Sequence, residues 1–416
     1  MKYKYKVFFV VLFFSKIVFS QTPPHIPLDL SSHEYQKLLD HYKNKPGVLI
    51  FDTLQSETQK AIEGGEKLSQ WLKLMNRQRS AEDQIRLTSK ETRKGVPIDS
   101  PNKYNERTIK EKYDTYTQEM PSEIIDVVYG QKQISAELPL EKETFIEHAR
   151  KIDRLYQSAV RWTTIMLPWK TWYIENKKRD VRGYYYLNQE SNLDEKLHDF
   201  QNLDLKTQDS FKEYLIGLCE NEIWTTHDEC VETLTTHISK NALVEYKNKY
   251  WRNSQSTWRA YFEIRDPRRD ITWTTQNPQK AMIPFINPKN KKILDFLKFN
   301  IEDEFKNNQW QLSMKFVNSG LDTAEVQFRP GVTPHVSSGN IIVMDANTPL
   351  EEYEVQWTIR HEFGHILRLP DCYVEFYDTH EDIAINYQLD TTDLMCSRAG
   401  DFNERIYTEL KRVYFR

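Results

Sequence analysis

Two histidines and a glutamate within five residues constrain this chain more than any other feature of its sequence. His361 and His365 are four residues apart, and Glu362 lies between them. On an α-helix such histidines lie one turn apart on the same face, so their imidazoles can converge on one cation. Glu362 is then placed to polarise a metal-bound water. This spacing is typical of a catalytic zinc site, with structural coincidence as the alternative.

The residues around the motif predict the helix that this chemistry needs. Thr348 is a candidate N-cap, Pro349 suits the first helical position, and Glu351 completes a capping box. We expect the helix to run to about Leu367. Its apolar positions are Trp357, Ile359, Phe363 and Ile366.

A catalytic zinc ion keeps three protein ligands and an open position for water, so a third ligand is needed. The helix is expected to stop near Arg368, and Asp371 then lies where the returning chain can bring a carboxylate under the metal. The alternatives are Glu375 or Glu381 as a carboxylate on a following helix, or His380 as a nitrogen ligand. A solvated turn carboxylate is the other interpretation of Asp371.

The string from His361 to Asp371 resembles the extended motif of the metzincin metallopeptidases, in the snapalysin-like variant with an Asp ligand. Residues 393–397, Asp-Leu-Met-Cys-Ser, resemble the Met-turn of that family. The resemblance covers roughly the last third of the chain. It implies one Zn²⁺ held by His361, His365 and Asp371, with Glu362 as the general base.

The sequence departs from the family pattern at two positions. Arg368 replaces a Gly, and a non-Gly residue in a left-handed turn costs about 1 kcal/mol. Ser397 stands where the family often has a Tyr that steadies the transition state. Tyr373 or Tyr377 are substitutes between which the spacing does not choose.

The fold class predicted is α+β: a mainly helical N-terminal region, then a metzincin-like domain with a twisted sheet, active-site helix, Met-turn and C-terminal helix. Periodicity predicts a helix, three strands and the motif helix in that order. The final helix is expected to be capped by Asp401 with Glu404. The apolar residues that define these elements are Ile293, Leu297, Ile301 and Phe305; Trp310, Leu312, Met314 and Phe316; Val326 and Phe328; 341–344; and Ile406, Leu410 and Val413.

We divide the chain into residues 1–20, a signal peptide; 21–255, a mainly helical accessory domain or prosegment; and 256–416, the zinc peptidase domain. In the helical region, Thr144 with Glu147 predicts a capping box. The expected core face of that helix is Phe145, Ala149, Ile152, Tyr156, Ala159, Val160 and Thr163. Residues 90–121, with many charges and few aliphatics, predict a solvated connection.

Residues 1–20 have a basic start, a short apolar run at 7–14 and a small-residue exit, which is typical of a signal peptide. We therefore expect an exported protein that is secreted, periplasmic or at the cell surface. Export permits disulfides, and the simplest pairing of the four cysteines is Cys219 with Cys230 and Cys372 with Cys396.

Composition narrows the choice of partners. The chain has 57 Lys and Arg against 61 Asp and Glu, so its net charge of -4 gives no electrostatic footprint for nucleic acid. No stretch reaches the ~20 apolar residues of a stable membrane span. We expect a protein or peptide substrate; the sequence does not decide the oligomeric state.

The leading hypothesis is an exported zinc-dependent endopeptidase, and the resemblance implies an extended substrate paired with a strand edge near residues 329–340. The alternative is a secreted or cell-surface binding protein with a vestigial or structural zinc site, since over half of the chain lies outside the resemblance. A third hypothesis makes the helical region a prosegment. His335 and the aromatic cluster at Trp169, Trp172 and 184–186 are given no site role.

Overall fold

The computed structural model describes residues 56–80, 82–87, 95–175, 180–222, 225–274, 279–330, 332–346, 350–351 and 353–414. The predicted signal peptide and the predicted helix start at Thr348 and Pro349 lie outside these residues. The described elements mix helices with small sheets, in agreement with the predicted α+β class. None of the described helices is long and apolar enough to cross a membrane.

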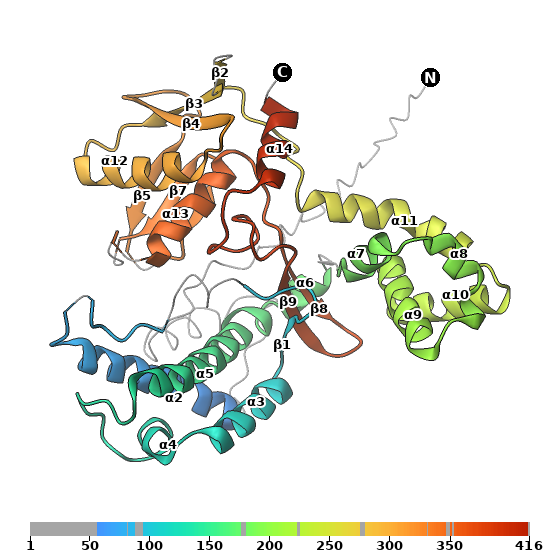
Figure 1. Ribbon diagram of the computed structural model, residues 1–416, viewed down its shortest axis with the longest axis horizontal. Coiled ribbons are helices and arrows are strands. Elements are labelled where there is room, and N and C mark those ends of the chain that lie inside the picture. Colours follow the sequence, from blue (N-terminus) through green and yellow to red (C-terminus); the bar gives the residue numbers. More distant parts are fainter. Residues whose placement is uncertain are drawn as a thin grey trace, which may run out of the picture.

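A first helical group, residues 56–175, packs around the long helix α5, Lys142–Arg161 (Figure 1). The predicted apolar face of α5 is buried throughout. Its N-cap differs from the prediction, because Glu141 rather than Thr144 accepts the first backbone N–H groups. The other members are α2 (Ser56–Asn76), α3 (Glu106–Glu119), α4 (Ser122–Val128), the π-helix η2 (Trp162–Met166) and α6 (Lys170–Glu175).

The prediction of a solvated connection at 90–121 is wrong for its described part. Strand β1, Asn102–Tyr104, is followed directly by α3, which Asn105 and Thr108 start with a reciprocal capping box. Ile109 is fully buried in α3, and Tyr104 is 5% exposed. A helix that packs on one face needs only a few apolar side chains, and α3 packs one face against α5. The low aliphatic content of this segment is therefore compatible with a packed helix.

A second helical group, residues 180–260, has a core of its own and lies apart from the first group in Figure 1. The predicted disulfide Cys219–Cys230 is present and joins two of its helices. The predicted helical region thus comprises two separately packed groups. The members of the second are α7 (Arg182–Gln189), α8 (Leu193–His198), the 3-10 helix η3 (Phe200–Asn202), α9 (Leu205–Glu220), α10 (His227–Ser239) and α11 (Leu243–Ala260).

Two three-stranded sheets belong to the C-terminal part, residues 264–414. Strand β3 (Gln279–Ile286) pairs in parallel with β4 (Trp310–Val317), and β5 (Glu325–Arg329) pairs in parallel with β7 (Ile341–Asp345). A hydrogen bond of 2.7 Å from Ile286 N–H to Ala324 O joins β3 to the start of β5. The two sheets have the strand orders β2-β3-β4 and β5-β7-β6, in which β2 (Thr272–Thr274) pairs antiparallel with β3 and β6 (His335–Ser337) is an antiparallel edge strand.

Most predicted elements of this part are observed. The helices are α12 (Lys291–Leu297) with the π-helix η4 (Lys298–Glu302), the motif helix α13 (Tyr353–Ile366) and α14 (Glu404–Tyr414). Asn403, not Asp401, caps α14, since its side chain accepts the N–H of Ile406. Sequence analysis missed β2 (Thr272–Thr274), β6 and β3, the last because Pro284 interrupts its pattern.

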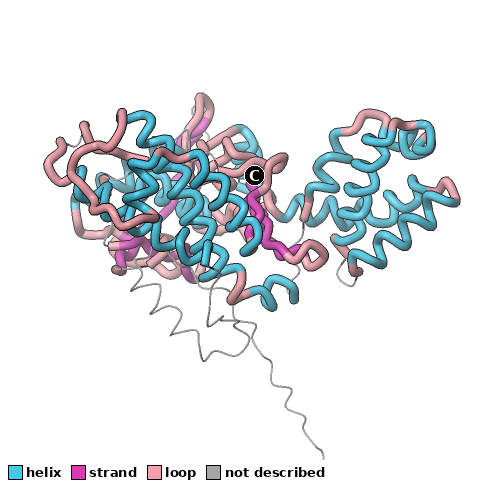
Figure 2. The backbone as a smooth tube through the Cα atoms, turned by 90° about the horizontal axis from the view of Figure 1, so that it is seen from below, coloured by secondary structure: helices cyan, strands magenta, loops and turns pink. Residues whose placement is uncertain are grey.

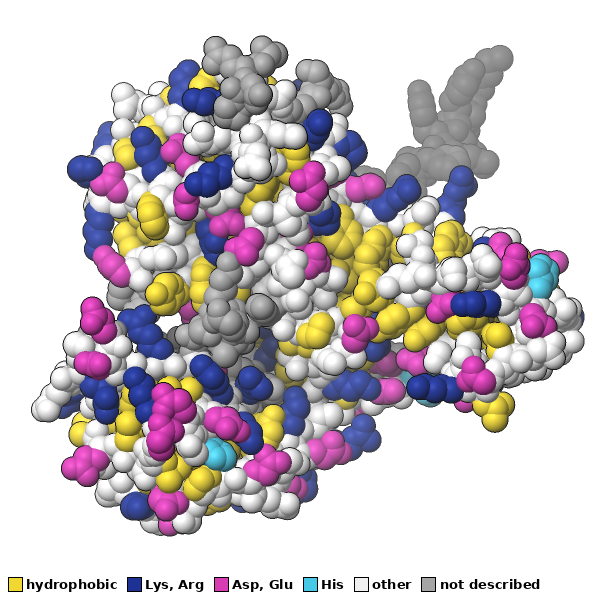
Figure 3. Space-filling model, viewed as in Figure 1, with side chains coloured by type: hydrophobic (Ala, Val, Ile, Leu, Met, Phe, Trp, Pro, Cys, Tyr) yellow, Lys and Arg dark blue, Asp and Glu magenta, His cyan; other side chains and the backbone are white. Residues whose placement is uncertain are grey.

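After the motif helix, β8 (Tyr373–Asp378) and β9 (Ile383–Gln388) form an antiparallel hairpin. Strand β1, from between the helices of the N-terminal region, pairs with the other edge of β9. Figure 2 shows the hairpin between the main body and the second helical group. In Figure 3, hydrophobic side chains gather where that group meets the C-terminal part, and Trp258 packs against the cores of both.

The crossing of α7 and α9 provides a matched test of this packing. At Gly183 an added Cβ would overlap the carbonyl oxygen of Tyr214, whereas at Gly217 it would only touch Gly183 at 3.5 Å. We expect Gly183→Ala to lower the free energy of unfolding by about 1–3 kcal/mol through overpacking. Gly217→Ala is expected to raise it by up to about 1 kcal/mol because Ala favours helix. Urea unfolding followed by circular dichroism measures both, and equal effects would contradict the described crossing.

Candidate metal centre

The motif helix and the chain that follows it bring three predicted ligands together. His361 and His365 lie on one face of α13, and their Nε2 atoms are 3.2 and 3.1 Å from Oδ1 of Asp371. The three side chains form a group in which all candidate ligand atoms lie within 4.8 Å of one another. Two imidazoles and one carboxylate are the donor set of a catalytic zinc site with an open fourth position.

Both imidazoles are oriented by backbone carbonyls. The Nδ1 atom of His361 is 2.8 Å from the carbonyl oxygen of Leu394, and that of His365 is 2.9 Å from the carbonyl oxygen of Leu369. A carbonyl oxygen only accepts, so Nδ1 carries a hydrogen, and Nε2 of each ring is left to face Asp371. The two carbonyls belong to the segments that follow α13 and complete the group.

The turn after α13 sets the position of Asp371. The N–H of Arg368 bonds to the carbonyl of His365 at 2.9 Å, and the N–H of Leu369 bonds to that of Gly364 at 3.0 Å. These bonds define a Schellman motif, in which the residue at the Arg368 position is left-handed. Arg368 has a φ of 67°, so the chain makes the turn that usually takes Gly with an arginine instead.

A disulfide ties Asp371 to the turn at residues 393–397. Cys372 follows Asp371, Cys396 follows Met395, and the two cysteines are bonded, as predicted. The N–H of Cys372 also donates to the carbonyl oxygen of Met395 at 3.2 Å. Cys372, Asp393 and Cys396 lie within ligand distance of each other, but the disulfide leaves neither cysteine a thiolate for a metal.

Met395 lies directly against the motif helix. A Cβ on Gly364 would overlap Sδ of Met395, so glycine at this position allows the close approach. The carboxylate of Asp393 holds the turn from inside, since it is fully buried and accepts the N–H of Met395 at 2.8 Å. Its other oxygen accepts from Nε of Arg405 at 2.6 Å. Sequence analysis gave Asp393 no role, because its partner Arg405 lies on the next helix.

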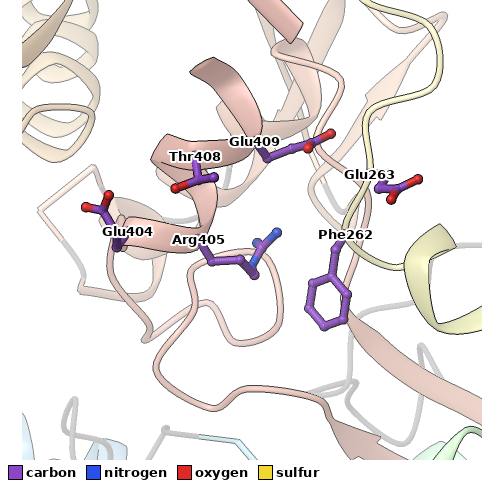
Figure 4. Close-up of a pocket in the computed structure, with 6 residues that line it drawn as sticks. All are labelled: Phe262, Glu263, Glu404, Arg405, Thr408 and Glu409. Carbon is purple, nitrogen blue, oxygen red and sulfur yellow. The ribbon is translucent and has the colours of Figure 1, made fainter. Parts of the chain in front are cut away.

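Arg405 also reaches a shallow pocket between α14 and the chain that follows α11. Its guanidinium lies 4.8 Å from the ring centroid of Phe262. Figure 4 shows the lining side chains, which are Phe262, Glu263, Glu404, Arg405, Thr408 and Glu409. None of the four predicted site residues is among them, so we interpret the pocket as part of the packing around α14.

The charges of His365 and Asp371 support one another. Burial opposes a charge on His365, but Asp371 and Glu362 outweigh it and raise the pKa of His365 to about 9. Burial likewise opposes a charge on Asp371, yet the two imidazoles hold the pKa of its carboxyl well below the usual value. The group therefore keeps its carboxylate ionised, with the Asp371 side chain 37% exposed.

Glu362 is placed differently from the three ligands. Its side chain is 4% exposed and does not belong to their group. Its Oε1 lies 4.0 Å from Nη2 of Arg398, which follows the turn at 393–397. A buried carboxylate beside a metal group, but not within it, suits a general base.

The alternative ligands lie elsewhere. Glu375 pairs with Arg161, and Glu381 pairs with Lys103 at 3.1 Å. The ring of His380 stacks on that of His227 at a centroid distance of 4.0 Å. His335 lies in β6, with Nδ1 2.8 Å from the carbonyl of Thr333.

The structure also distinguishes the two tyrosines that the spacing left open. The negative charge of Asp371, together with burial, raises the pKa of Tyr373 well above its usual value, which shows that the hydroxyl of Tyr373 lies near the carboxylate of Asp371. Tyr377 instead donates to Asp382 at 2.6 Å. Tyr373 is therefore the tyrosine at the candidate centre.

Comparisons with protein-family models, curated proteins and solved structures found no match for this chain.

The left-handed turn at Arg368 yields a prediction that separates backbone strain from side-chain contacts. Arg368→Gly and Arg368→Ala both remove the side chain, but only Gly relieves the strain. We expect the Gly variant to be more stable than the Ala variant by about 1 kcal/mol. Urea unfolding in the presence of a chelator measures the difference without a contribution from bound metal.

Arg252 in the interior of α11 is the matched control for this pair. Arg252 is exposed and helical, so Arg252→Ala is expected to be more stable than Arg252→Gly, again by about 1 kcal/mol. The same order at both positions would contradict a left-handed residue at 368.

Proposed function

We propose that this chain is an exported zinc-dependent endopeptidase with a metzincin-like catalytic domain at residues 256–416. The convergence of His361, His365 and Asp371 is the observation that carries the proposal. Its support is the donor set, two oriented imidazoles and an adjacent buried glutamate. The predicted leader sequence and the two disulfides, which are typical of oxidising compartments, support export.

The surrounding elements favour the metzincin-like interpretation of the fold. A sheet precedes the motif helix α13, the chain turns back at Arg368, and Met395 lies under the helix. The C-terminal helix α14 then follows. This is the order of elements that the sequence resemblance implied. The helical region at 21–255 would be an accessory domain, because it supplies β1 to the hairpin after the motif.

In the proposed reaction, His361, His365 and Asp371 would hold Zn²⁺, which when bound would supply a Lewis acid for the water and the scissile carbonyl. Glu362 takes the proton of the attacking water and delivers it to the nitrogen of the leaving amine. Tyr373 would direct its hydroxyl towards the substrate carbonyl once a metal has taken Asp371 as a ligand. Leu394 and Leu369 keep the two imidazoles in orientation throughout.

The substrate would lie extended along β6. One edge of this strand pairs with β7, and no described strand pairs with its other edge. β6 lies within the predicted range 329–340 and is in contact with α13. A peptide can add to such an edge by main-chain hydrogen bonds.

The general base is tested by Glu362→Gln. We expect this variant to bind one zinc per chain but to lose about 10²-fold or more in kcat/KM for peptide hydrolysis, because the amide cannot accept the proton. Zinc content by atomic absorption and cleavage of internally quenched peptides are the two measurements. A variant that cleaves at nearly the normal rate would rule out this role.

The third ligand is tested by Asp371→Asn, with Glu381→Gln as the matched carboxylate-to-amide control. Zinc affinity is expected to fall for Asp371→Asn and to stay unchanged for Glu381→Gln, whose carboxylate lies on the hairpin and pairs with Lys103. Competition with a fluorescent chelator gives both affinities. Undiminished zinc binding by Asp371→Asn would return the alternative ligands to consideration.

A further inference from the structure

An exposed arginine, Arg398, lies next to Glu362 at the candidate metal centre. Arg398 follows the turn at 393–397, and Nη2 of its guanidinium is 4.0 Å from Oε1 of Glu362. Its side chain is 48% exposed. Its positive charge also opposes the rise in the pKa of Tyr373, so Arg398 lies near Tyr373 as well as Glu362.

The contact between Arg398 and Glu362 is too long to be a hydrogen bond. At 4.0 Å it is at the outer limit of an ion pair, whereas Nε of Arg405 lies 2.6 Å from Asp393. A guanidinium has five N–H donors in a planar fork that matches a carboxylate. Among the described residues, Glu362 is the one carboxylate within 4.0 Å of Arg398. The fork can therefore turn towards another acceptor.

Arg161, the second guanidinium that acts on Tyr373, differs in this respect. It forms an ion pair with Glu375, and it is 20% exposed. Glu375 is in turn bonded to Asn386 at 3.2 Å. Arg161 thus has a fixed partner, whose side chain is 15% exposed, and it joins α5 to the hairpin. Arg398 is the guanidinium that is open to a substrate.

We propose that Arg398 binds a carboxylate of the substrate directly beside the scissile bond. The inference rests on the proposed peptidase function and names its substrate class, peptides with a negative charge at the cleavage point. Glu362 must contact the water that attacks the scissile carbonyl, and Arg398 is 4.0 Å from Glu362. A carboxylate held by Arg398 therefore belongs to a residue adjoining the cleaved bond.

The substrate carboxylate that Arg398 binds can come from two sources, an Asp or Glu side chain within the peptide or a free C-terminal carboxylate. Quenched peptides with Glu, Gln or Lys beside the cleaved bond, and with a free or an amidated C-terminus, distinguish them. With the zinc-loaded wild-type protein we expect kcat/KM to be roughly tenfold higher for the carboxylate than for its matched amide, the usual scale of a charge-assisted hydrogen bond. Arg398→Gln is expected to abolish the preference and Arg398→Glu to favour Lys.

Binding is measured separately, so that the inference does not depend on turnover. Zinc-loaded Glu362→Gln leaves the peptide intact, and its affinity for fluorescent Glu and Gln peptides is compared with that of Glu362→Gln/Arg398→Gln by anisotropy. We expect tighter binding of the Glu peptide only where Arg398 is present. Arg252→Gln, an exposed arginine on α11, is the control for loss of one surface charge, and circular dichroism checks the fold of each variant.

The outcomes separate the two proposals. Equal turnover and equal binding of Glu and Gln peptides would overturn the inference and leave the peptidase standing. A uniform fall in kcat for all peptides in Arg398→Gln, without a change in preference, would also overturn it, because Arg398 would then act on the transition state. If the protein bound the Glu peptide more tightly than the Gln peptide but cleaved no peptide, the peptidase proposal would be wrong and the carboxylate site would stand.

Discussion

The disulfide between Cys372 and Cys396 joins the two segments on which the candidate centre depends. One cysteine follows Asp371 and the other follows Met395, so a single covalent bond sets the distance between Asp371 and the turn under the motif helix. The carbonyl of Leu394, two residues before Cys396, orients His361. The buried carboxylate of Asp393 then fixes this turn to α14 through Arg405. Asp371, the carbonyl of Leu394 and the contact of Met395 with the motif helix are thereby held as one unit.

The helical region is joined to this unit more closely than its position in the chain suggests. Strand β1 pairs with β9, and the α5 residue Arg161 forms an ion pair with Glu375 in β8. The second helical group reaches the same hairpin, where His227 stacks on His380 and Asp180 accepts the hydroxyl of Tyr387 at 2.7 Å. A prosegment is removed from the chain, and removal of this region would take a strand away from the sheet that follows Asp371. This favours an accessory domain over a prosegment.

The elements that sequence analysis predicted correctly are those whose signal is local. The apolar faces of α5 and β4 repeat with the helical and strand periods, and burial follows them. The elements that it missed depend on distant partners. Strand β3 contains Pro284 and is held between β4 and β5, and β1 has only three residues, which are stabilised by pairing with β9 some 280 positions later. The N-caps of α5 and α14 were predicted wrongly, because several polar residues near each helix start can act as the N-cap.

The sequence alone determined the two histidines on one helical face and the adjacent glutamate, because a four-residue spacing on a helix leaves little freedom. It also predicted the cysteine pairs from their grouping along the chain. Only the tertiary structure decided that Asp371, rather than Glu375, Glu381 or His380, meets the histidines, because the left-handed turn at Arg368 reverses the chain there. The same is true of Tyr373 and Arg398. Their places at the centre follow from a hairpin and a turn whose positions depend on contacts between segments distant in sequence.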